Sequence, residues 1–368
     1  MKEKPIRVGH IVGKMMGGGV ESMVLNYYRH IDRTKVQFDF IVNDDSTVIP
    51  TDEITSLGGR IYNIPTYKKM IEYDNELFDL LKKNQYPIVH SHVNSLSVFP
   101  LRVAKKAKTQ VRIAHSHSTS APGETKKNIA KNILRPYSKL YPTDYMACSN
   151  AAAKWLFGSR TSNYHLIKNG IETSKFRFNG IDRKEVREEL GLTDQFVIGH
   201  TGRLCFQKNQ QFLIHLLPHI LKERPNTVLL LLGDGEDREI LEDLVIKLDV
   251  QSIVLFLGNK SDVHRYYSAM DVFVFPSKYE GFGISSIEAQ VSGLPVIQSK
   301  QVPVETKISD HCIFLNHYDD YEKWVDEILK TRITNRSQLN QAHSKYEIKN
   351  SVKELEDFYL EKYKGSGN

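Results

Sequence analysis

Short apolar runs alternate with amphipathic stretches along most of the chain. The runs have the length and composition of buried β-strands, and they fall into two series: 6–12, 38–42, 88–89, 111–114 and 145–147, then 196–199, 228–232, 253–257, 272–275 and 295–297. Stretches with helical spacing separate the runs. This alternation predicts an α/β fold of two Rossmann-like domains, each built on a parallel sheet with its ligand chemistry at the carboxyl edge.

The spacing of the two series also predicts the domain boundaries. A chain of 368 residues is long for a single core, and the turn pair Asn169-Gly170 between the series suits a hinge. We therefore expect domains over residues 1–168 and 172–345. A helix is predicted over 346–364, and it must bury an apolar stripe with 4-3-4 spacing: Ile348, Val352, Leu355 and Tyr359.

Composition narrows the class of protein. With 40% hydrophobic and 26% charged residues and no apolar run of about 18 residues, the chain is expected to be a cytoplasmic protein without a signal peptide. Its three cysteines lack C-x-x-C spacing, which argues against a disulfide framework and a zinc-binding cysteine site. The net charge is a modest +6.

Basic residues are concentrated in one part of the first series. Residues 102–139 carry ten Lys and Arg against one acid, Glu124. Within 124–141 these bases alternate with apolar residues around Pro136, so the segment either lies on an anionic membrane surface or is a helix with a solvated basic face. Nucleic-acid binding is not favoured, because interleaved aromatic stacking motifs are lacking.

Two glutamates eight positions apart mark a candidate ligand site in the second series. Glu280 follows the run 272–275 in a glycine-containing loop, and Glu288 falls about one turn inside the next predicted helix. Gly281 and Gly283 allow a ligand to approach the backbone, and a helix N-terminus favours anions. Alone, this spacing is equally typical of a solvated helix face.

Two cations follow the first strand of the second series. Arg203 and Lys208 are expected near the carboxyl end of that strand and the start of the next helix. A planar guanidinium and a compact ammonium together suit a diphosphate, although two surface bases remain the simpler alternative.

A glycine turn after the first strand, Gly17-Gly18-Gly19, resembles a phosphate cradle at a helix start. The alternative is a dinucleotide fingerprint with Asp44 or Asp45 as the ribose acid, which the missing third glycine disfavours.

Histidines cluster in His90-Ser-His92 and His115-Ser-His117, each directly after a predicted strand. Alternating histidines can bind a metal, but no matching carboxylate cluster accompanies them, so we expect no metal site. His115 is predicted to have a hydrogen-bonding or electrostatic role in a cleft, whereas a structural role is the simpler interpretation of His90 and His117.

Eight motifs follow one another along nearly the whole chain. They are Gly17-Gly18-Gly19-x-Glu21, a His-Ser-His after a strand, Lys168-Asn-Gly-Ile171, Gly202-Arg203 with Lys208, Gly233-Asp-Gly235, Phe275-Pro-Ser277, Glu280-x7-Glu288 and Gly293-Leu-Pro-Val-Ile297. In this order the chain resembles the family 4 retaining glycosyltransferases. The last motif, with Val302-Pro-Val-Glu305, is most similar to the branch that builds bacterial exopolysaccharide and capsule repeat units.

The resemblance implies a GT-B fold, with an interdomain cleft and a C-terminal helix crossing back to the N-terminal domain. It further implies transfer from a nucleotide-sugar, preferably UDP-linked, to a saccharide or polyprenyl-diphosphate-linked acceptor, with no cofactor and no metal. The protein would then be cytoplasmic, either free or peripheral on the inner face of the membrane. A nucleotide-sugar epimerase and a non-catalytic sugar-nucleotide-binding protein are the alternatives.

The resemblance also implies roles for particular residues. Glu288 would hold the ribose, and Arg203 with Lys208 the leaving diphosphate. The donor sugar would lie near His115. The remaining donor contacts would come from Glu280 and from positions where the backbone approaches closely: Gly18, Gly19, Phe282, Gly283 and Ile284. Two departures from the commonest family pattern, His115-Ser in place of His-Asp and Val20 in the glycine loop, bear on the choice of acceptor.

Overall fold

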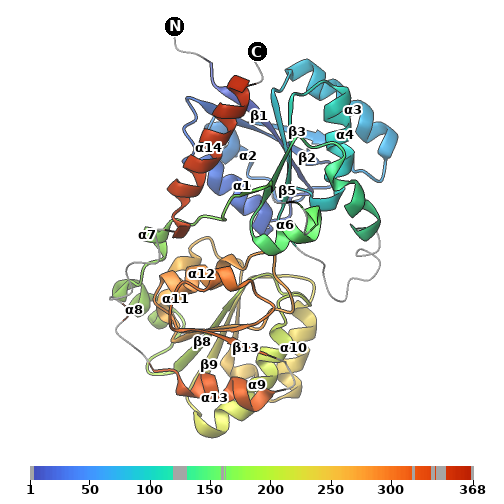
Figure 1. Cartoon of the computed structure of the whole chain (residues 1–368). Helices are drawn as coiled ribbons and strands as arrows, with labels where there is room; N and C mark the ends of the chain where they lie inside the picture. Colours follow the sequence, from blue (N-terminus) through green and yellow to red (C-terminus); the bar gives the residue numbers. More distant parts are fainter. Residues whose placement is uncertain are drawn as a thin grey trace. The chain divides into compact units, whose positions relative to one another are not determined.

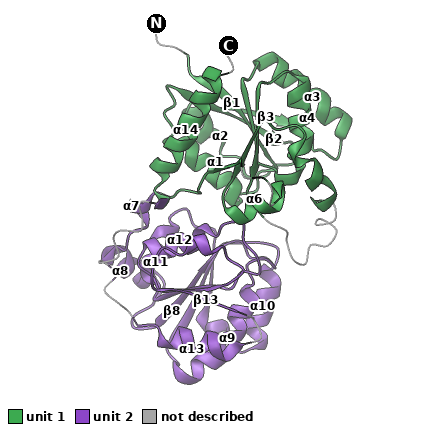
Figure 2. Cartoon of the chain, in the orientation of Figure 1, with its two compact units in different colours: residues 1–171, 346–368 green, residues 172–345 purple. Residues whose placement is uncertain are grey.

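The computed structural model describes residues 4–118, 131–158, 161, 163–316, 320–332, 336 and 345–365. It divides into two compact units (Figure 2). Unit 1 comprises Met1–Ile171 and Tyr346–Asn368, and unit 2 comprises Glu172–Lys345. Each unit contains its own cluster of buried apolar side chains. Among the described residues, no helix is long and apolar enough to cross a membrane.

Unit 1 is a seven-stranded parallel sheet with helices on both sides (Figure 1). The strand order is β3-β2-β1-β4-β5-β6-β7, so the winding direction reverses between β1 and β4. The elements are β1 (Ile6–Gly13), α1 (Gly19–His30), β2 (Val36–Asn43), α2 (Thr51–Ser56), β3 (Arg60–Ile64), α3 (Met70–Asn84), β4 (Ile88–Ser91), η1 (Asn94–Ser97), α4 (Val98–Lys106), β5 (Val111–Ser116), η2 (Arg135–Lys139), β6 (Asp144–Ala147), α6 (Asn150–Phe157), β7 (His165–Leu166) and α14 (Ile348–Gly365).

The buried strands of unit 1 were predictable from their composition, and all five predicted runs are confirmed as β1, β2, β4, β5 and β6. The two strands at the sheet edges, β3 and β7, are partly exposed, and their mixed sequences lack a continuous apolar run. β7 is only two residues long. Edge strands therefore escaped the pattern because one side of each faces solvent.

The C-terminal helix α14 belongs to unit 1. Its predicted stripe is confirmed: Ile348, Val352, Leu355 and Tyr359 are at most 3% exposed and join the unit 1 core. Gly170 packs against the first residue of this helix, and only glycine fits there because a Cβ would lie 2.7 Å from the Ile348 Cα. The helix buries on folding an apolar face that would otherwise be exposed.

Unit 2 is a six-stranded parallel sheet with the order β10-β9-β8-β11-β12-β13, so its winding reverses between β8 and β11. The elements are α7 (Thr173–Phe176), α8 (Gly180–Glu189), β8 (Phe196–Thr201), α9 (Gln210–Glu223), β9 (Thr227–Leu232), α10 (Arg238–Lys247), η3 (Gln251–Ile253), β10 (Val254–Gly258), α11 (Val263–Ala269), β11 (Val272–Phe275), α12 (Ile284–Val291), β12 (Val296–Ser299), η4 (Val304–Thr306), β13 (Cys312–Leu315) and α13 (Tyr321–Lys330). The predicted α/β class of two parallel-sheet domains is confirmed.

Candidate active site

The candidate site of unit 2 lies where its sheet reverses direction. In doubly wound sheets, ligands bind outside the carboxyl ends of the two strands at this point, which here are β8 and β11. The loop after β8 and the loop after β11 are joined by hydrogen bonds: Lys278 N to Gln207 O (2.8 Å), Gln207 Nε2 to Tyr279 O (3.0 Å) and Asn209 Nδ2 to Pro276 O (3.2 Å). These bonds fix the two loops relative to each other.

The joined loops bring Lys208 and Glu280 into contact. The Lys208 ammonium donates to Glu280 Oε1 at 2.7 Å, and the two side chains are 16% and 6% exposed. The same ammonium lies 4.7 Å from the centroid of the Phe275 ring, which adds a cation–π contact. An ammonium has three donors, so Lys208 can keep Glu280 and still bind an anion.

Glu288 lies in α12 and is held by a tyrosine from α11. The Tyr267 hydroxyl donates to Glu288 Oε2 at 2.8 Å. Burial raises the pKa of Glu288 from 4.5 to about 7, although the Tyr267 hydrogen bond and the Lys208 charge act in the opposite direction. Burial also raises the pKa of Tyr267 well above its ordinary value, so its hydroxyl remains a donor. Glu288 is thus a partly buried carboxyl group with a raised pKa, so it changes charge near neutral pH.

Arg203 differs from Lys208 in its exposure. Its side chain is 57% exposed, and its Nε lies 2.9 Å from Glu236 Oε2, which is equally exposed. Exposed ion pairs of this kind contribute roughly 0–1 kcal/mol, so an incoming anion can replace Glu236 at little cost. Arg203 is therefore close to the loops but not locked in place.

Glycines allow the loops around the site to pack closely. A Cβ at Gly233 would lie 2.2 Å from Gly202 O, and one at Gly235 would lie 2.3 Å from Leu204 O. No side chain fits in either place. The motif Gly233-Asp-Gly235 is therefore explained by the contact between the loops after β8 and β9.

The start of α12 lies beside Glu280. Gly283 precedes the helix with a φ of 93°, in the left-handed region that favours glycine. A Cβ built on it would lie 3.8 Å from the Glu280 Cγ. Phe282 is buried, and Ile284 begins the helix. The structure thus gathers the predicted residues of this loop around one carboxylate.

The glycine loop of unit 1 binds a carboxylate of its own. Glu21 Oε2 accepts the backbone N–H groups of Met16 (2.9 Å), Gly17 (2.6 Å) and Gly18 (2.9 Å). Gly19 begins α1. The predicted anion-binding turn is present, but in this state the Gly18 N–H bonds Glu21 and is not open to a phosphate.

His115 lies in β5 and is enclosed by other side chains. The residue is 0% exposed, and its Nδ1 lies 3.1 Å from His90 Nε2. Burial lowers its pKa well below the ordinary value, so the ring is neutral. β5 places the His115 ring inside unit 1, and its role in a cleft stays a prediction.

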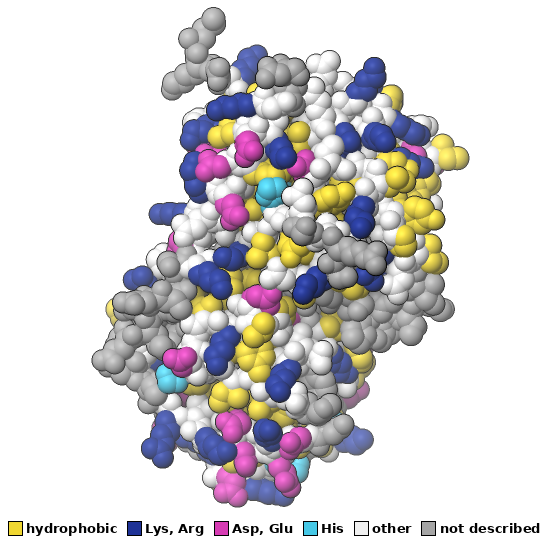
Figure 3. Space-filling model, viewed as in Figure 1, with side chains coloured by type: hydrophobic (Ala, Val, Ile, Leu, Met, Phe, Trp, Pro, Cys, Tyr) yellow, Lys and Arg dark blue, Asp and Glu magenta, His cyan; other side chains and the backbone are white. Residues whose placement is uncertain are grey.

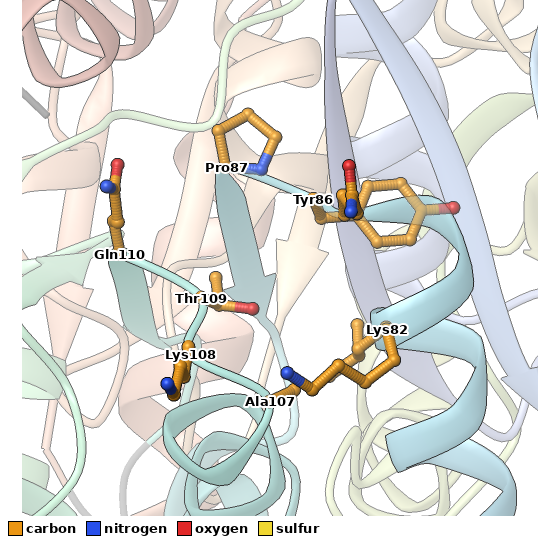
Figure 4. A pocket seen from close by; sticks show the side chains of 9 residues that line it. Lys82, Tyr86, Pro87, Ala107, Lys108, Thr109 and Gln110 are labelled. Atoms are coloured by element: carbon orange, nitrogen blue, oxygen red, sulfur yellow. The ribbon is translucent and has the colours of Figure 1, made fainter. Parts of the chain in front are cut away.

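A pocket of about 330 Å³ lies at the amino ends of the strands in the unit 1 sheet. It is lined by residues between the ends of α3 and α4, including Lys82, Gln85 and Lys108, and by the segments that lead into β4 and β5 (Figure 4). These are the amino ends of the strands, where doubly wound sheets do not bind their ligands. The pocket therefore does not lie at the carboxyl edge of its own sheet.

Comparison with known proteins decides the family. The model of glycosyl transferases group 1 matches residues 182–346, and that of glycosyltransferase family 4 matches residues 17–175. A protein of Bacillus subtilis (strain 168) assigned as the glycosyltransferase EpsF is 33% identical over 311 residues, which cover 82% of this chain and 81% of the relative. The chain belongs to the family 4 glycosyltransferases. The resemblance drawn from its motifs is confirmed.

Two further comparisons extend this assignment. The UDP-Gal:alpha-D-GlcNAc-diphosphoundecaprenol alpha-1,3-galactosyltransferase of Escherichia coli is 23% identical over 97% of both chains. The crystal structure of Anabaena Alr3699/HepE in complex with UDP and glucose superposes with a TM-score of 0.80 at 16% identity, covering 96% of this chain and 99% of that one. This glycosyltransferase therefore has the GT-B fold.

Two contacts in this glycosyltransferase were not predicted from the sequence: Tyr267 with Glu288 in unit 2, and Glu21 with the glycine loop in unit 1. Tyr267 has no local signal, because its partner Glu288 is 21 positions away and the contact depends on how α11 and α12 pack. Glu21 did have a signal, since a glutamate three residues after a helix N-cap commonly bonds back to the N-cap backbone. That pattern could have predicted that the carboxylate of Glu21 occupies the N–H groups of the glycine loop.

Proposed function

We propose that this glycosyltransferase transfers a sugar from a UDP-sugar to a lipid-linked acceptor, with retention of configuration, in bacterial surface polysaccharide synthesis. The observation that carries the proposal is the paired Lys208 and Glu280 together with the partly buried Glu288 and its raised pKa, at the reversal point of the unit 2 sheet. HepE was crystallised with UDP and with UDP-glucose, which supports uridine as the base.

Glu288 binds the ribose of the donor. A partly exposed carboxylate at the carboxyl edge of the sheet can accept hydrogen bonds from both ribose hydroxyls. These hydrogen bonds favour the ionised form, which burial disfavours in the free protein. Binding of the nucleoside and loss of the Glu288 proton are therefore coupled.

Lys208 and Arg203 hold the diphosphate. One is a fixed ammonium and the other a mobile guanidinium, and both follow β8. As the sugar–oxygen bond breaks, negative charge grows on the diphosphate, and preorganised cations stabilise it. We expect this charge to be met by these side chains without a divalent ion.

Glu280 holds the hydroxyl groups of the donor sugar, together with the backbone at Phe282, Gly283 and Ile284. Its remaining lone pairs accept sugar hydroxyls while Lys208 neutralises its charge. The acceptor hydroxyl then attacks the anomeric carbon on the face that the diphosphate leaves. A diphosphate oxygen takes the hydroxyl proton, so no enzyme nucleophile is needed.

Unit 1 contributes the acceptor side. Gly18 and Gly19 approach the donor phosphates only if Glu21 first releases the loop N–H groups. His115 affects sugar transfer only through the histidine rings next to it, because its own ring is buried and has no atom exposed to a substrate. The name of the Escherichia coli relative contains a diphosphoundecaprenol acceptor, which supports a polyprenyl-diphosphate-linked substrate here.

A segment of unit 1 supports peripheral membrane binding. The predicted amphipathic segment is 124–141, of which residues 124–130 lie outside the described residues. In the described part, Ile133 (63%), Tyr137 (53%) and Leu140 (57%) are exposed apolar side chains. They alternate with Lys131, Arg135 and Lys139. Exposed apolar residues among bases favour an anionic lipid surface over a merely solvated face.

The charge on one face of the molecule is mixed. On the face drawn in Figure 3, Lys and Arg side chains are interspersed with acidic ones on both units. A nucleic-acid reader requires a continuous basic surface. We therefore expect no nucleic-acid partner.

A donor screen tests the proposal. Thermal shift and donor hydrolysis are measured with UDP-, GDP- and ADP-sugars, and we expect a response to UDP-sugars that is lost in Glu288→Ala. Product analysis without acceptor separates transfer from epimerisation. Conversion of the donor to its epimer, or a response to none of the nucleotides, would contradict the proposed reaction.

A further inference from the structure

Five histidines meet beside the reversal point of the unit 1 sheet. His10 is in β1, His90 in β4 and His115 in β5, while His92 and His117 directly follow β4 and β5. The register pairs His10 with His90, and His90 with Ile113, which is two residues before His115. Since alternate residues of a strand point to the same side, the five histidines lie on one face of three neighbouring strands. All five are at most 7% exposed.

The rings form two short hydrogen-bonded chains. His92 Nε2 lies 3.0 Å from His10 Nδ1, and His92 Nδ1 lies 3.0 Å from His117 Nε2. His90 joins Tyr359 to His115, with distances of 2.6 and 3.1 Å. Burial lowers the pKa of every ring, so all five are neutral and each carries one N–H and one lone pair.

These chains cannot satisfy all of their nitrogens. His10 Nε2, His115 Nε2 and His117 Nδ1 are buried and have no hydrogen-bond partner among the described residues. An unpaired buried polar atom is destabilising, and structures keep such atoms only when something compensates for them. Three unpaired nitrogens in one cluster therefore call for a ligand.

Two triads have the spacing of a metal site. Nitrogens of His10, His90 and His92 lie within 4.8 Å of one another, and so do nitrogens of His92, His115 and His117. Two of the unpaired nitrogens belong to residues of the second triad, His115 and His117, and one belongs to His10 of the first. We propose that His92, His115 and His117 bind one transition-metal ion of the Zn²⁺ type.

The donor set limits which ion fits. Within the described residues, both triads consist of imidazoles alone. Hard ions such as Mg²⁺ and Mn²⁺ require oxygen ligands, whereas imidazole suits Zn²⁺, Co²⁺, Ni²⁺ and copper. Three histidines leave a fourth position for a water molecule.

The site would join the carboxyl ends of β4 and β5. It lies next to the turn where the backbone N–H of His117 donates to Asn94 Oδ1 at 2.7 Å. Its role is to hold these two strand ends in place. It is separate from the cations proposed to bind the donor diphosphate, which belong to unit 2.

Metal titration of the whole chain tests the proposal. Tag-free protein is stripped with dipicolinate, dialysed and titrated with Zn²⁺ in a calorimeter, and parallel samples receive Co²⁺ and Mn²⁺. We expect one equivalent of Zn²⁺ to bind, a visible absorption band of tetrahedral Co²⁺, a higher melting temperature with Zn²⁺, and no response to Mn²⁺. Absence of both Zn²⁺ binding and the Co²⁺ band in the wild type would overturn the proposal without recourse to any variant.

Variants then locate the site. His117→Gln should lose the equivalent, while the matched control His165→Gln, at an exposed histidine of β7, should keep it. Circular dichroism of the metal-free proteins shows whether each variant folds. If His117→Gln folds and still binds Zn²⁺ while His10→Gln does not, the assigned triad is wrong. Equal loss in His117→Gln and His165→Gln would also overturn it.

Discussion

Replacing Glu288 with glutamine should make the protein more stable at alkaline pH. In the unfolded chain this glutamate loses its proton near its ordinary pKa of 4.5, and in the folded protein it keeps the proton up to about pH 7. Between these values the folded state binds more protons than the unfolded state, so stability falls as pH rises. Above pH 7 the loss is complete and constant. Glutamine is neutral throughout and avoids it.

The structure sets the size of this effect. Raising a pKa from 4.5 to about 7 corresponds to roughly 3 kcal/mol, which is an upper limit because Tyr267 and Lys208 adjust to the new side chain. Below pH 4.5 the carboxyl group is protonated in both states, and the difference disappears. We therefore expect Glu288→Gln to match the wild type at pH 4.5 and to exceed it by about 1–3 kcal/mol at pH 8.

Urea unfolding at both pH values measures the difference, with Glu239→Gln, at an exposed glutamate of α10, as the control. Glu288→Gln should also bind UDP more weakly, because a carboxamide offers one acceptor atom to the ribose, whereas the carboxylate offers two. If the stability advantage of Glu288→Gln is the same at pH 4.5 and pH 8, the buried ionisation is not its cause. A stability gain without loss of UDP affinity would refute the ribose role alone.

Three further predictions concern transfer and membrane binding. Glu280→Gln should spare UDP affinity in calorimetry and reduce sugar transfer, and an equal loss of UDP affinity in Glu280→Gln and Glu288→Ala would contradict their separate roles. Lys208→Ala should lower kcat by about 100-fold or more. Wild-type activity should persist in excess EDTA. If EDTA abolishes activity and Mn²⁺ restores it, the diphosphate site is not metal-free. Ile133→Asp/Tyr137→Asp should lose salt-sensitive sedimentation with anionic vesicles, whereas equal sedimentation of variant and wild type would remove the membrane proposal.

The order of elements and the family were open to prediction because they depend on local patterns. A buried strand needs a continuous apolar run whatever surrounds it, and the five runs of each series became strands. Likewise, Gly233 and Gly235 stand where no Cβ fits, and such positions leave a glycine in the sequence as a visible mark. Edge strands β3 and β7 have no continuous apolar run, because solvent covers part of them.

The chemistry of the sites was decided by tertiary structure. Lys208 and Glu280 are 72 positions apart, and only the pairing of β8 with β11 brings their loops together. The pKa of Glu288 depends on burial and on Tyr267, neither of which the Glu280-x7-Glu288 spacing contains. The pairing of β1, β4 and β5 also places His115 in a five-histidine cluster, which the separate sequence motifs did not reveal. A sequence states which groups are present, but their charge and partners depend on the solvent that packing removes and on the residues that it brings into contact.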